Sequence, residues 1–309
     1  MKILIPNSIP VRIATDDTVV EYDIKADIPE EHHDADVFVV WGNSPERLGR
    51  AAQQLSQVQL VQTFMAGPDA VLAAGFREGA AICSGVGMHD RTVTEHALAL
   101  TLGLVRKVPQ LIEAKERHEW LWEMSGRQEL HTKPVTTLID ANVLIWGFGS
   151  IGQRLAGVLQ GLGATVRGVA RSAGERAGFP VVDEARLDEA LAGTDVLIMI
   201  LPKTDETTNA LDAARLAQLP RHAYVVNVGR GTTVDEAALI AALESGSIAG
   251  AALDVMWQEP LPTDSPLWDA PHLLLSPHAA GGRPIGVDDL LAHQLAALRD
   301  GTPLRNRAR

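Results

Sequence analysis

The feature that most constrains the fold is a glycine-rich turn between an apolar run and a helix-like segment. The run at 143–146 predicts a buried strand, a G-x-G-x-x-G turn follows at 147–152, and residues 153–159 continue as a helix. In such a unit the first glycine makes the tight turn, the second admits a pyrophosphate and the third lets helix and strand pack closely. We therefore expect a dinucleotide at the N-terminus of this helix. The expected contacts are Gly147, Phe148, Gly149, Ser150, Ile151 and Gly152.

The residues after this turn lack an expected acid. No Asp or Glu occurs between Gly147 and Gly174, although a carboxylate about 20 residues after the motif usually holds the ribose of NAD. The next predicted strand instead ends in Arg171 and Ser172, which can bind a 2′-phosphate, and Arg176 is close enough to assist. We therefore expect NADP (NADPH) to be preferred, with NAD possible. The alternative is that these are ordinary surface residues and cofactor specificity is loose.

Composition and charge exclude several other classes of protein. The chain has 309 residues, of which 46% are hydrophobic, enough for one large domain or two of ordinary size. Its formal net charge of −12 argues against nucleic acid or an anionic membrane as a general partner. The single cysteine, Cys83, excludes an internal disulfide framework and a Cys-based zinc site, and it fits a reducing cytoplasm. The first apolar stretch is too short for a signal peptide, and no apolar run is long enough for a membrane span.

Short apolar strands alternate with helical segments along the chain, which predicts parallel sheets in an α/β protein. Because the glycine-rich turn begins near the middle of the chain, the earlier residues must form a separate domain. We expect a doubly wound Rossmann domain at 92–281 and a smaller α/β domain at 1–91 and 282–309. The expected strands are 2–5, 37–41, 60–62, 80–83, 143–146, 165–170, 195–201, 223–228, 248–255 and 273–276, and the expected helices 46–55, 70–75, 92–106, 153–159, 235–245 and 290–299.

Two neighbouring segments have less ordinary patterns. The predicted helix 92–106, with Thr94 as a plausible cap, is apolar on most sides and should be buried between units. The segment 109–134 is charged, shows poor periodicity and carries Trp120 and Trp122. It is either a solvated surface arm with two core tryptophans or an arm that packs on a second subunit.

Three charged side chains follow predicted strands of the second domain. Arg230 lies in the run 227–231, Glu259 in the run 254–262 and His278 in the run 276–281. Ligands bind beyond the carboxyl ends of parallel strands, so the three can converge near a nicotinamide. Singly, each also has an ordinary structural interpretation, as a salt bridge, a loop carboxylate and a core histidine. Together with the glycine-rich turn they predict a catalytic site.

These motifs, in this order, resemble the D-isomer-specific 2-hydroxyacid dehydrogenase family over nearly the whole chain. Besides the turn, the resemblance rests on Leu-Pro with Glu-Thr at 201–207, Asn-x-x-Arg-Gly, Asp-Val…Glu-Pro and Pro-His-x-x-Gly. Within the family the chain is most similar to NADPH-dependent glyoxylate/hydroxypyruvate reductases, which also place Arg-Ser or Arg-Thr after the second strand. The resemblance implies a flavodoxin-like substrate domain and a homodimer built through the nucleotide domain.

The resemblance also implies roles for individual residues. Arg230 would hold the substrate carboxylate and carbonyl oxygen, His278 would be the acid/base, and Glu259 would orient the imidazole. Backbone N–H groups of Ala66 and Gly67 would meet the carboxylate, and Trp41 would either wall the pocket or pack in the core. The other cofactor contacts implied are Leu201, Pro202, Thr207, Val228, Gly229, Asp254, His278, Gly281 and Arg230 itself.

We therefore expect reduction of a small 2-oxoacid, glyoxylate- or hydroxypyruvate-like, to the D-2-hydroxyacid. One alternative is a dinucleotide-sensing regulatory protein of the same fold. Another is a family dehydrogenase that uses NAD, of the formate or phosphite type. No metal, nucleic acid or membrane is expected as a partner, and the adjacent His32 and His33 are expected in a solvated loop.

Overall fold

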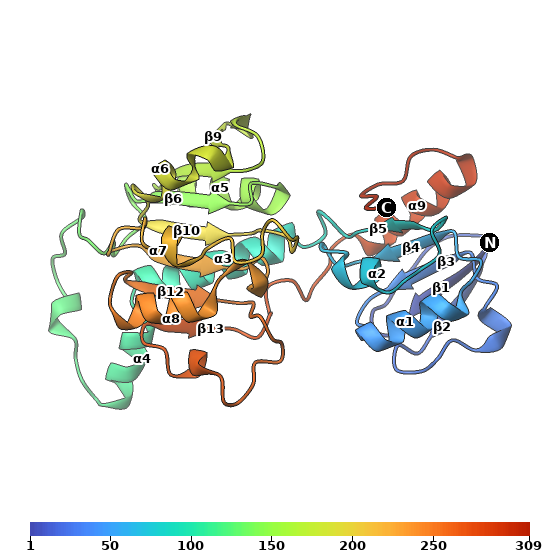
Figure 1. Cartoon of the computed structure of the whole chain (residues 1–309), viewed down its shortest axis with the longest axis horizontal. Helices are drawn as coiled ribbons and strands as arrows, with labels where there is room; N and C mark the ends of the chain where they lie inside the picture. Colours follow the sequence, from blue (N-terminus) through green and yellow to red (C-terminus); the bar gives the residue numbers. More distant parts are fainter. The chain divides into compact units, whose positions relative to one another are not determined.

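The computed structural model describes all residues 1–309, which divide into two compact units. Unit 1 comprises Met1–His89 and Gly281–Arg309, and unit 2 comprises Asp90–Ala280. Each unit contains one sheet with helices on both faces (Figure 1). The bounds of the units fall close to the expected boundaries at 91 and 282.

Unit 1 is a five-stranded parallel sheet in the order β2-β1-β3-β4-β5. This is the flavodoxin-like strand order, so the fold expected for this unit is confirmed. Strand β2 was not predicted, because it is an edge strand whose side chains are mostly exposed and form no apolar run. The elements of unit 1 are β1 (Lys2–Pro6), β2 (Thr18–Tyr22), β3 (Val37–Val40), α1 (Pro45–Gln54), β4 (Leu60–Thr63), α2 (Asp69–Ala73), β5 (Ala81–Cys83) and α9 (Val287–Asp300).

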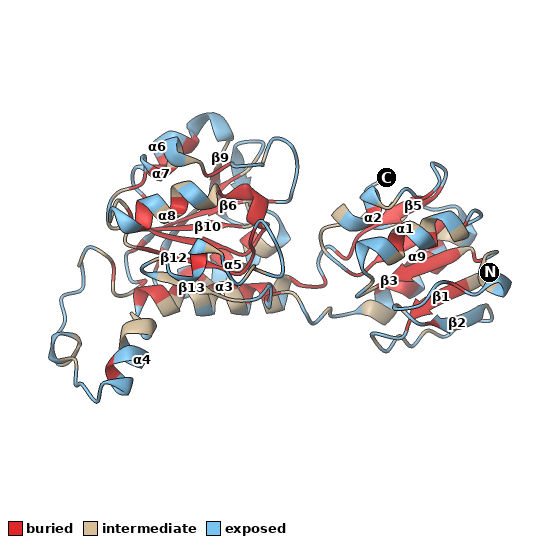
Figure 2. Ribbon diagram, turned by 60° about the horizontal axis from the view of Figure 1, so that its bottom comes forward, coloured by how far each residue is buried: buried red, intermediate tan, exposed pale blue.

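Strand side chains of unit 1 alternate between two hydrophobic clusters. Leu4 and Phe38 pack with Leu48 of α1 on one face of the sheet. Ile3 packs with Leu291 of α9 on the other face. Figure 2 shows the buried strands of this sheet between helices whose outer sides are exposed. The segment after residue 281 thus supplies the second helical layer of unit 1.

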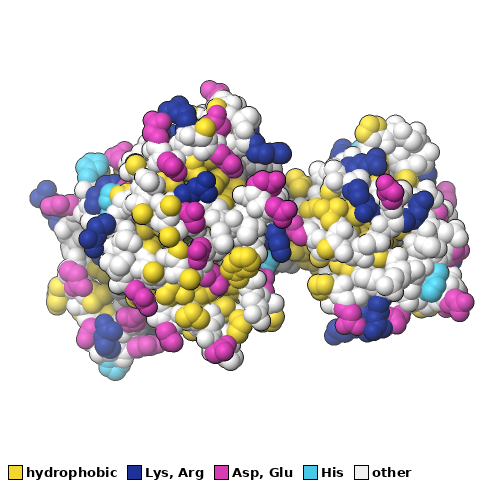
Figure 3. All heavy atoms as spheres, viewed as in Figure 1, with side chains coloured by type: hydrophobic (Ala, Val, Ile, Leu, Met, Phe, Trp, Pro, Cys, Tyr) yellow, Lys and Arg dark blue, Asp and Glu magenta, His cyan; other side chains and the backbone are white.

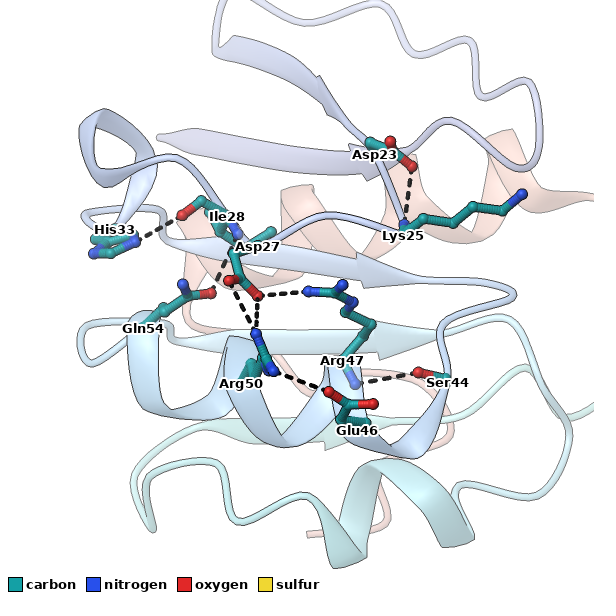
Figure 4. A network of polar contacts seen from close by, with 10 residues as sticks. All are labelled: Asp23, Lys25, Asp27, Ile28, His33, Ser44, Glu46, Arg47, Arg50 and Gln54. Carbon is teal, nitrogen blue, oxygen red and sulfur yellow. Dashed lines mark hydrogen bonds and ion pairs between the residues drawn. The ribbon is translucent and has the colours of Figure 1, made fainter.

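Polar contacts fasten the loop after β2 to α1 (Figure 4). The Asp27 carboxylate accepts hydrogen bonds from Arg47 (2.7 Å) and Arg50 (3.2 Å) of that helix. The His33 Nε2 atom lies 2.8 Å from the carbonyl oxygen of Ile28 in the same loop. Nowhere in the chain do three or more His, Cys, Asp or Glu side chains gather as they would around a metal ion.

Unit 2 is an eight-stranded sheet in the order β13-β12-β11-β10-β6-β7-β9-β8. The run β9-β7-β6-β10-β11-β12 has the Rossmann order 3-2-1-4-5-6, which confirms the doubly wound prediction. Only β8 is antiparallel, in a short hairpin with β9, and neither strand of this hairpin was predicted. The strands are β6 (Asn142–Trp146), β7 (Thr165–Val169), β8 (Gly174–Arg176), β9 (Phe179–Val182), β10 (Val196–Met199), β11 (Tyr224–Asn227), β12 (Gly250–Leu253) and β13 (Leu273–Leu275), and the helices α3 (Asp90–Val105), α4 (Val108–Glu116), α5 (Ser150–Gly161), α6 (Leu187–Leu191), α7 (Ala213–Leu216) and α8 (Glu236–Glu244).

The sheet of unit 2 is covered on both faces. Ile145 of β6 packs in a cluster with side chains of α3 and α5, whereas its neighbour Leu144 packs with α6, α7 and α8. No helix of the protein is both long and apolar enough to cross a membrane. Acidic and basic side chains are interspersed on the face of each unit seen in Figure 3.

Two expectations for residues 92–134 are wrong. Helix α3 begins at Asp90, so Thr94 is buried inside the helix and does not cap it. Trp120 and Trp122 are 70% and 77% exposed, so they are not core residues. The segment also contains α4, which its charged residues concealed. Figures 1 and 2 both show α4 and the loop after it extending away from the sheet of unit 2.

Candidate active site

Two glycines of the turn after β6 are required by close backbone packing. Gly147 has a φ of +101°, and a Cβ atom at this position would lie 2.5 Å from the carbonyl oxygen of Ile200. A Cβ atom on Gly152 would lie 2.8 Å from the carbonyl oxygen of Gly147 and 3.2 Å from Cγ2 of Ile145. Only glycine fits at either position without displacing the backbone. The turn therefore brings α5 close against β6.

The remaining glycine of the turn, Gly149, faces open space, which a bound pyrophosphate requires. No atom lies within 4 Å of a Cβ built on Gly149. Gly149 is also the N-cap of α5, and no side chain caps this helix. The first N–H groups of a helix have no partner within it, and they point toward an anion placed there. The Phe148 side chain is 1% exposed and packs against Phe179, so only its backbone can meet a dinucleotide.

Three polar side chains gather beyond the end of β7. Arg171 and Ser172 are exposed directly after this strand. The β8–β9 hairpin brings Arg176 back toward them, and its Nη2 atom donates to the Ser172 hydroxyl at 2.8 Å. Its Nη1 atom lies 3.5 Å from the carbonyl oxygen of Phe148 in the glycine-rich turn. The two guanidinium groups and the hydroxyl can together bind a phosphate next to the turn.

The loop after β11 is shaped by a buried amide. Oδ1 of Asn227 accepts from the Gly229 N–H at 3.0 Å, and Nδ2 donates to the Arg230 carbonyl at 3.0 Å. Nη1 of Arg230 donates to the Gly229 carbonyl at 2.8 Å. A Cβ atom on Gly229 would lie 2.7 Å from the backbone of Leu201, so this loop packs directly on the end of β10. Asn227 thus fixes the turn that carries Arg230.

Contact between Gly231 and the Met256 backbone sets the position of Glu259 relative to the turn that carries Arg230. A Cβ atom on Gly231 would lie 1.9 Å from the carbonyl carbon of Met256. The Met256 N–H in turn donates to Oε1 of Glu259 at 3.0 Å. The Met256 backbone, which orients the Glu259 carboxylate, therefore packs directly against Gly231, where a side chain would not fit.

The second oxygen of Glu259 meets His278. Its Oε2 atom lies 2.7 Å from Nδ1 of His278, which leaves Nε2 of the imidazole for a substrate. Burial raises the pKa of Glu259, but the hydrogen bonds from His278 and Met256 and the charges of His278 and Arg230 outweigh this effect. The pKa of Glu259 therefore lies below its usual 4.5, and the carboxylate is ionised at neutral pH. The structure thus brings the three predicted catalytic residues to one edge of the sheet.

Asp254 shapes the loop that carries His278. Its carboxylate is buried and accepts hydrogen bonds from Oγ of Ser276 (2.6 Å), N–H of Ala279 (2.8 Å) and N–H of Ala280 (3.1 Å). The Asp254 carbonyl accepts from the His278 N–H at 2.7 Å. These bonds give Asp254 a structural role in addition to the cofactor contact expected of it. A further partner, Nε2 of His96 at 3.0 Å, was missed.

The remaining residues expected at the cofactor lie at the ends of β10 and β11 or beyond them. Leu201 and Val228 are 6% and 7% exposed. The Thr207 hydroxyl donates to the Pro202 carbonyl at 2.7 Å and so shapes the loop after β10. Gly281 is the first residue of the segment that returns to unit 1.

The backbone donors expected at the substrate, Ala66 and Gly67, lie in unit 1 after β4. The Phe64 carbonyl oxygen lies 2.7 Å from Nε2 of His89, and the Met65 carbonyl accepts from the Gly85 N–H at 2.7 Å. These bonds hold the start of the loop that continues to Ala66 and Gly67. The Trp41 ring stacks on the His89 ring, with centroids 5.6 Å apart and planes at 15°, and so packs against the residue that supports the loop.

Comparison with known proteins gives a family match within unit 2. Residues 98–280 match the family model described as D-isomer specific 2-hydroxyacid dehydrogenase, NAD binding domain. Glyoxylate/hydroxypyruvate reductase A of Klebsiella pneumoniae (strain 342) is 42% identical over 170 residues, which are 53% of this chain and 54% of that protein. The match therefore spans about half the length of this curated relative.

Solved structures match over the whole chain. The NADPH-dependent glyoxylate/hydroxypyruvate reductase from Sinorhizobium meliloti, in complex with NADP and sulfate, has a TM-score of 0.83 at 28% identity, covering 99% of this chain and 97% of that chain. A D-isomer specific 2-hydroxyacid dehydrogenase from Xanthobacter autotrophicus Py2, in complex with NADPH and MES, has a TM-score of 0.81 at 26% identity, covering 100% and 98%. The chain belongs to the D-isomer specific 2-hydroxyacid dehydrogenase family.

Proposed function

We propose that this protein catalyses the NADPH-dependent reduction of a small 2-oxoacid, glyoxylate- or hydroxypyruvate-like, to the D-2-hydroxyacid. The observation that carries the proposal is the His278–Glu259 pair at 2.7 Å, on the sheet edge that also carries Arg230 and the glycine-rich turn. Relatives and structural neighbours named as glyoxylate/hydroxypyruvate reductases support this choice of substrate class.

Three side chains would perform the chemistry on the substrate. Arg230 offers a planar fork of N–H donors, which matches the carboxylate and carbonyl oxygens of a 2-oxoacid. Nε2 of His278 would donate a proton to the carbonyl oxygen, because Nδ1 is already held by Glu259. The ionised Glu259 favours the imidazolium form and fixes the orientation of the ring. Bound nicotinamide would supply the hydride to the carbonyl carbon.

The proposal also includes the backbone contacts expected for the substrate carboxylate. Ala66 and Gly67 have N–H groups on the supported loop after β4, whereas Pro68 has none. We infer that the substrate carboxylate meets these N–H groups. Replacing Ala66 by Pro would remove one donor, and we expect KM for the 2-oxoacid to rise with little change in the dissociation constant of NADPH.

The preference for NADPH rests on Arg171, Ser172 and Arg176. Each charge-assisted hydrogen bond to a 2′-phosphate contributes about 1.5–3 kcal/mol. We therefore expect Arg176→Ala to lower kcat/KM for NADPH by about 10- to 100-fold while leaving kcat/KM for NADH nearly unchanged. Arg186→Ala is the matched control, because this exposed arginine of unit 2 pairs with Glu189 at 3.1 Å instead.

The deciding assay is nucleotide oxidation over a panel of 2-oxoacids with both NADPH and NADH. Turnover of glyoxylate or hydroxypyruvate with higher kcat/KM for NADPH would support the proposal. Turnover with NADH preferred would refute the cofactor assignment. No turnover of any 2-oxoacid by a protein that binds NADPH would refute the activity and favour the dinucleotide-sensing alternative.

We also propose that the protein forms a homodimer through the arm at 108–133. Besides the two exposed tryptophans, this arm exposes Leu111 and Ile112 of α4, which are 44% and 53% accessible. Apolar side chains on a segment that extends from the sheet would be buried by a second copy of the chain.

A further inference from the structure

One histidine of unit 2 lies beside the catalytic loop without belonging to any of the motifs. His96 is on α3, the first helix of unit 2, and its ring is 24% exposed. Its Nε2 atom lies 2.9 Å from Oγ of Ser276 and 3.0 Å from Oδ1 of Asp254. His96 and Ser276 are separated by 180 positions in the sequence. The contact therefore joins the first helix of unit 2 to its last loop.

Each hydrogen bond among His96, Ser276 and Asp254 can be assigned one donor and one acceptor. Ser276 has one hydroxyl proton, and its Oγ atom lies 2.6 Å from the Asp254 carboxylate, the stronger acceptor. Nε2 of His96 then carries a proton and donates it to Ser276 or to Asp254. A chain of hydrogen bonds thus runs from His96 through Ser276 to the buried carboxylate.

The same carboxylate holds the backbone around His278. The N–H groups of Ala279 and Ala280 donate to Asp254 at 2.8 and 3.1 Å. His278 itself has a φ of +51°, a left-handed conformation that a residue with a side chain adopts only when its surroundings impose it. A contact that fixes the Asp254 carboxylate therefore also fixes the orientation of the His278 imidazole toward the substrate.

We propose that His96, acting through Ser276 and Asp254, is a positioning residue for the acid/base His278. This inference rests on the proposed function, because it assumes that His278 transfers a proton. Removing the His96 donor would leave the Asp254 carboxylate with one hydrogen bond fewer and would loosen the loop at 276–280. Misplacing a catalytic group by about 1 Å can lower the rate by about 100-fold.

The test compares His96→Leu with His96→Gln. Leucine removes the donor, whereas the glutamine side-chain amide keeps an N–H group in a comparable place. We expect kcat to fall by roughly 10- to 100-fold in His96→Leu and to recover most of the loss in His96→Gln. KM for the 2-oxoacid and the dissociation constant of NADPH should change less than threefold in both variants.

Unit 2 contains a matched control. His222 places Nε2 3.0 Å from Oδ1 of Asp195, a carboxylate as buried as that of Asp254, at the opposite end of the strands. His222→Leu should therefore lower Tm about as much as His96→Leu does. It should leave kcat unchanged, because Asp195 holds no part of the catalytic loop.

Amide hydrogen exchange gives a measurement that does not depend on turnover. We expect the amides of His278, Ala279 and Ala280 to exchange faster in His96→Leu and at the wild-type rate in His222→Leu. Unchanged exchange and unchanged kcat in His96→Leu would overturn the inference, as would an equal loss of kcat in both leucine variants. If the wild-type protein reduces no 2-oxoacid, the proposed function fails, and the exchange rates alone decide whether His96 holds the loop.

Discussion

Replacing Gly231 by alanine should separate catalysis from cofactor binding. The added Cβ atom would start 1.9 Å from the carbonyl carbon of Met256. Ordinary contacts of this kind are about 3.5–4 Å, so one backbone segment must move by roughly 1.5–2 Å. Because the Met256 N–H holds Oε1 of Glu259, this movement displaces the partner of His278. A shift of about 1 Å at a catalytic group can cost about 100-fold in rate, so we expect kcat to fall by at least that factor.

The assay combines steady-state kinetics, NADPH titration and thermal unfolding. The residues proposed to hold the pyrophosphate and the 2′-phosphate follow β6 and β7, whereas Gly231 follows β11, so the dissociation constant of NADPH should change less than threefold. Gly157→Ala is the control, since no atom lies within 4 Å of a Cβ at this position in α5. Alanine inside a helix stabilises it by about 0.5–1 kcal/mol relative to glycine, so that variant should keep its kcat and unfold at a slightly higher temperature. A Gly231→Ala protein with near wild-type kcat would refute the argument that backbone contact positions Glu259.

Further outcomes follow from charged residues and from the exposed tryptophans. Glu259→Gln should lower kcat about 10- to 100-fold, and the lowered pKa of Glu259 means that this carboxylate adds no acid limb to the wild-type kcat/KM profile above pH 4.5. Burial raises the pKa of Asp195, but the hydrogen bonds from Lys133 and the Asn142 N–H and the charges of Lys133 and His222 lower it by more, so the pKa in the folded protein lies below 3.8. The ionised Asp195 therefore contributes its full stabilisation above pH 3.8. This stabilisation is lost as the pH falls through the pKa of the folded state. Asp195→Asn should accordingly reduce the free energy of unfolding at pH 7 by about 2–3 kcal/mol, measured by urea titration, with kcat unchanged. Replacing Trp120 and Trp122 by serine should convert a dimer to a monomer in size-exclusion chromatography with light scattering, and a monomeric wild-type protein at micromolar concentration would contradict the proposed interface.

Most of the strands predicted from the sequence have side chains buried on both faces. Strand β10 is buried throughout and forms a continuous apolar run, which is visible without the structure. Strands β2 and β8 are edge strands with mostly exposed residues, and β8 consists of Gly174, Glu175 and Arg176. Their pairing is decided by neighbouring strands and not by their own composition, so no periodicity could reveal them.

In the candidate site, too, some residues could be predicted from the sequence and others could not. Arg230, Glu259 and His278 could be predicted because each follows a strand, and the rule for parallel sheets brings strand ends together. His96 could not, because it lies in a helix and meets the loop 180 residues away only when that helix packs on the sheet. The need for glycine at 231 is equally invisible in the sequence, since it arises from the approach of the Met256 backbone.

The residues that would select the cofactor and those that would perform the chemistry lie in different surroundings. Arg171 and Ser172 are exposed after β7 and belong to no buried network. Asn227 and Asp254, which fix the loops of Arg230 and His278, are fully buried, and their hydrogen bonds extend into the surrounding backbone. A substitution at the exposed positions changes a contact with a ligand and little else, whereas one at the buried positions leaves polar groups unsatisfied and costs stability as well as rate. Preference between NADPH and NADH can therefore change in this fold while the chemistry of the site stays fixed.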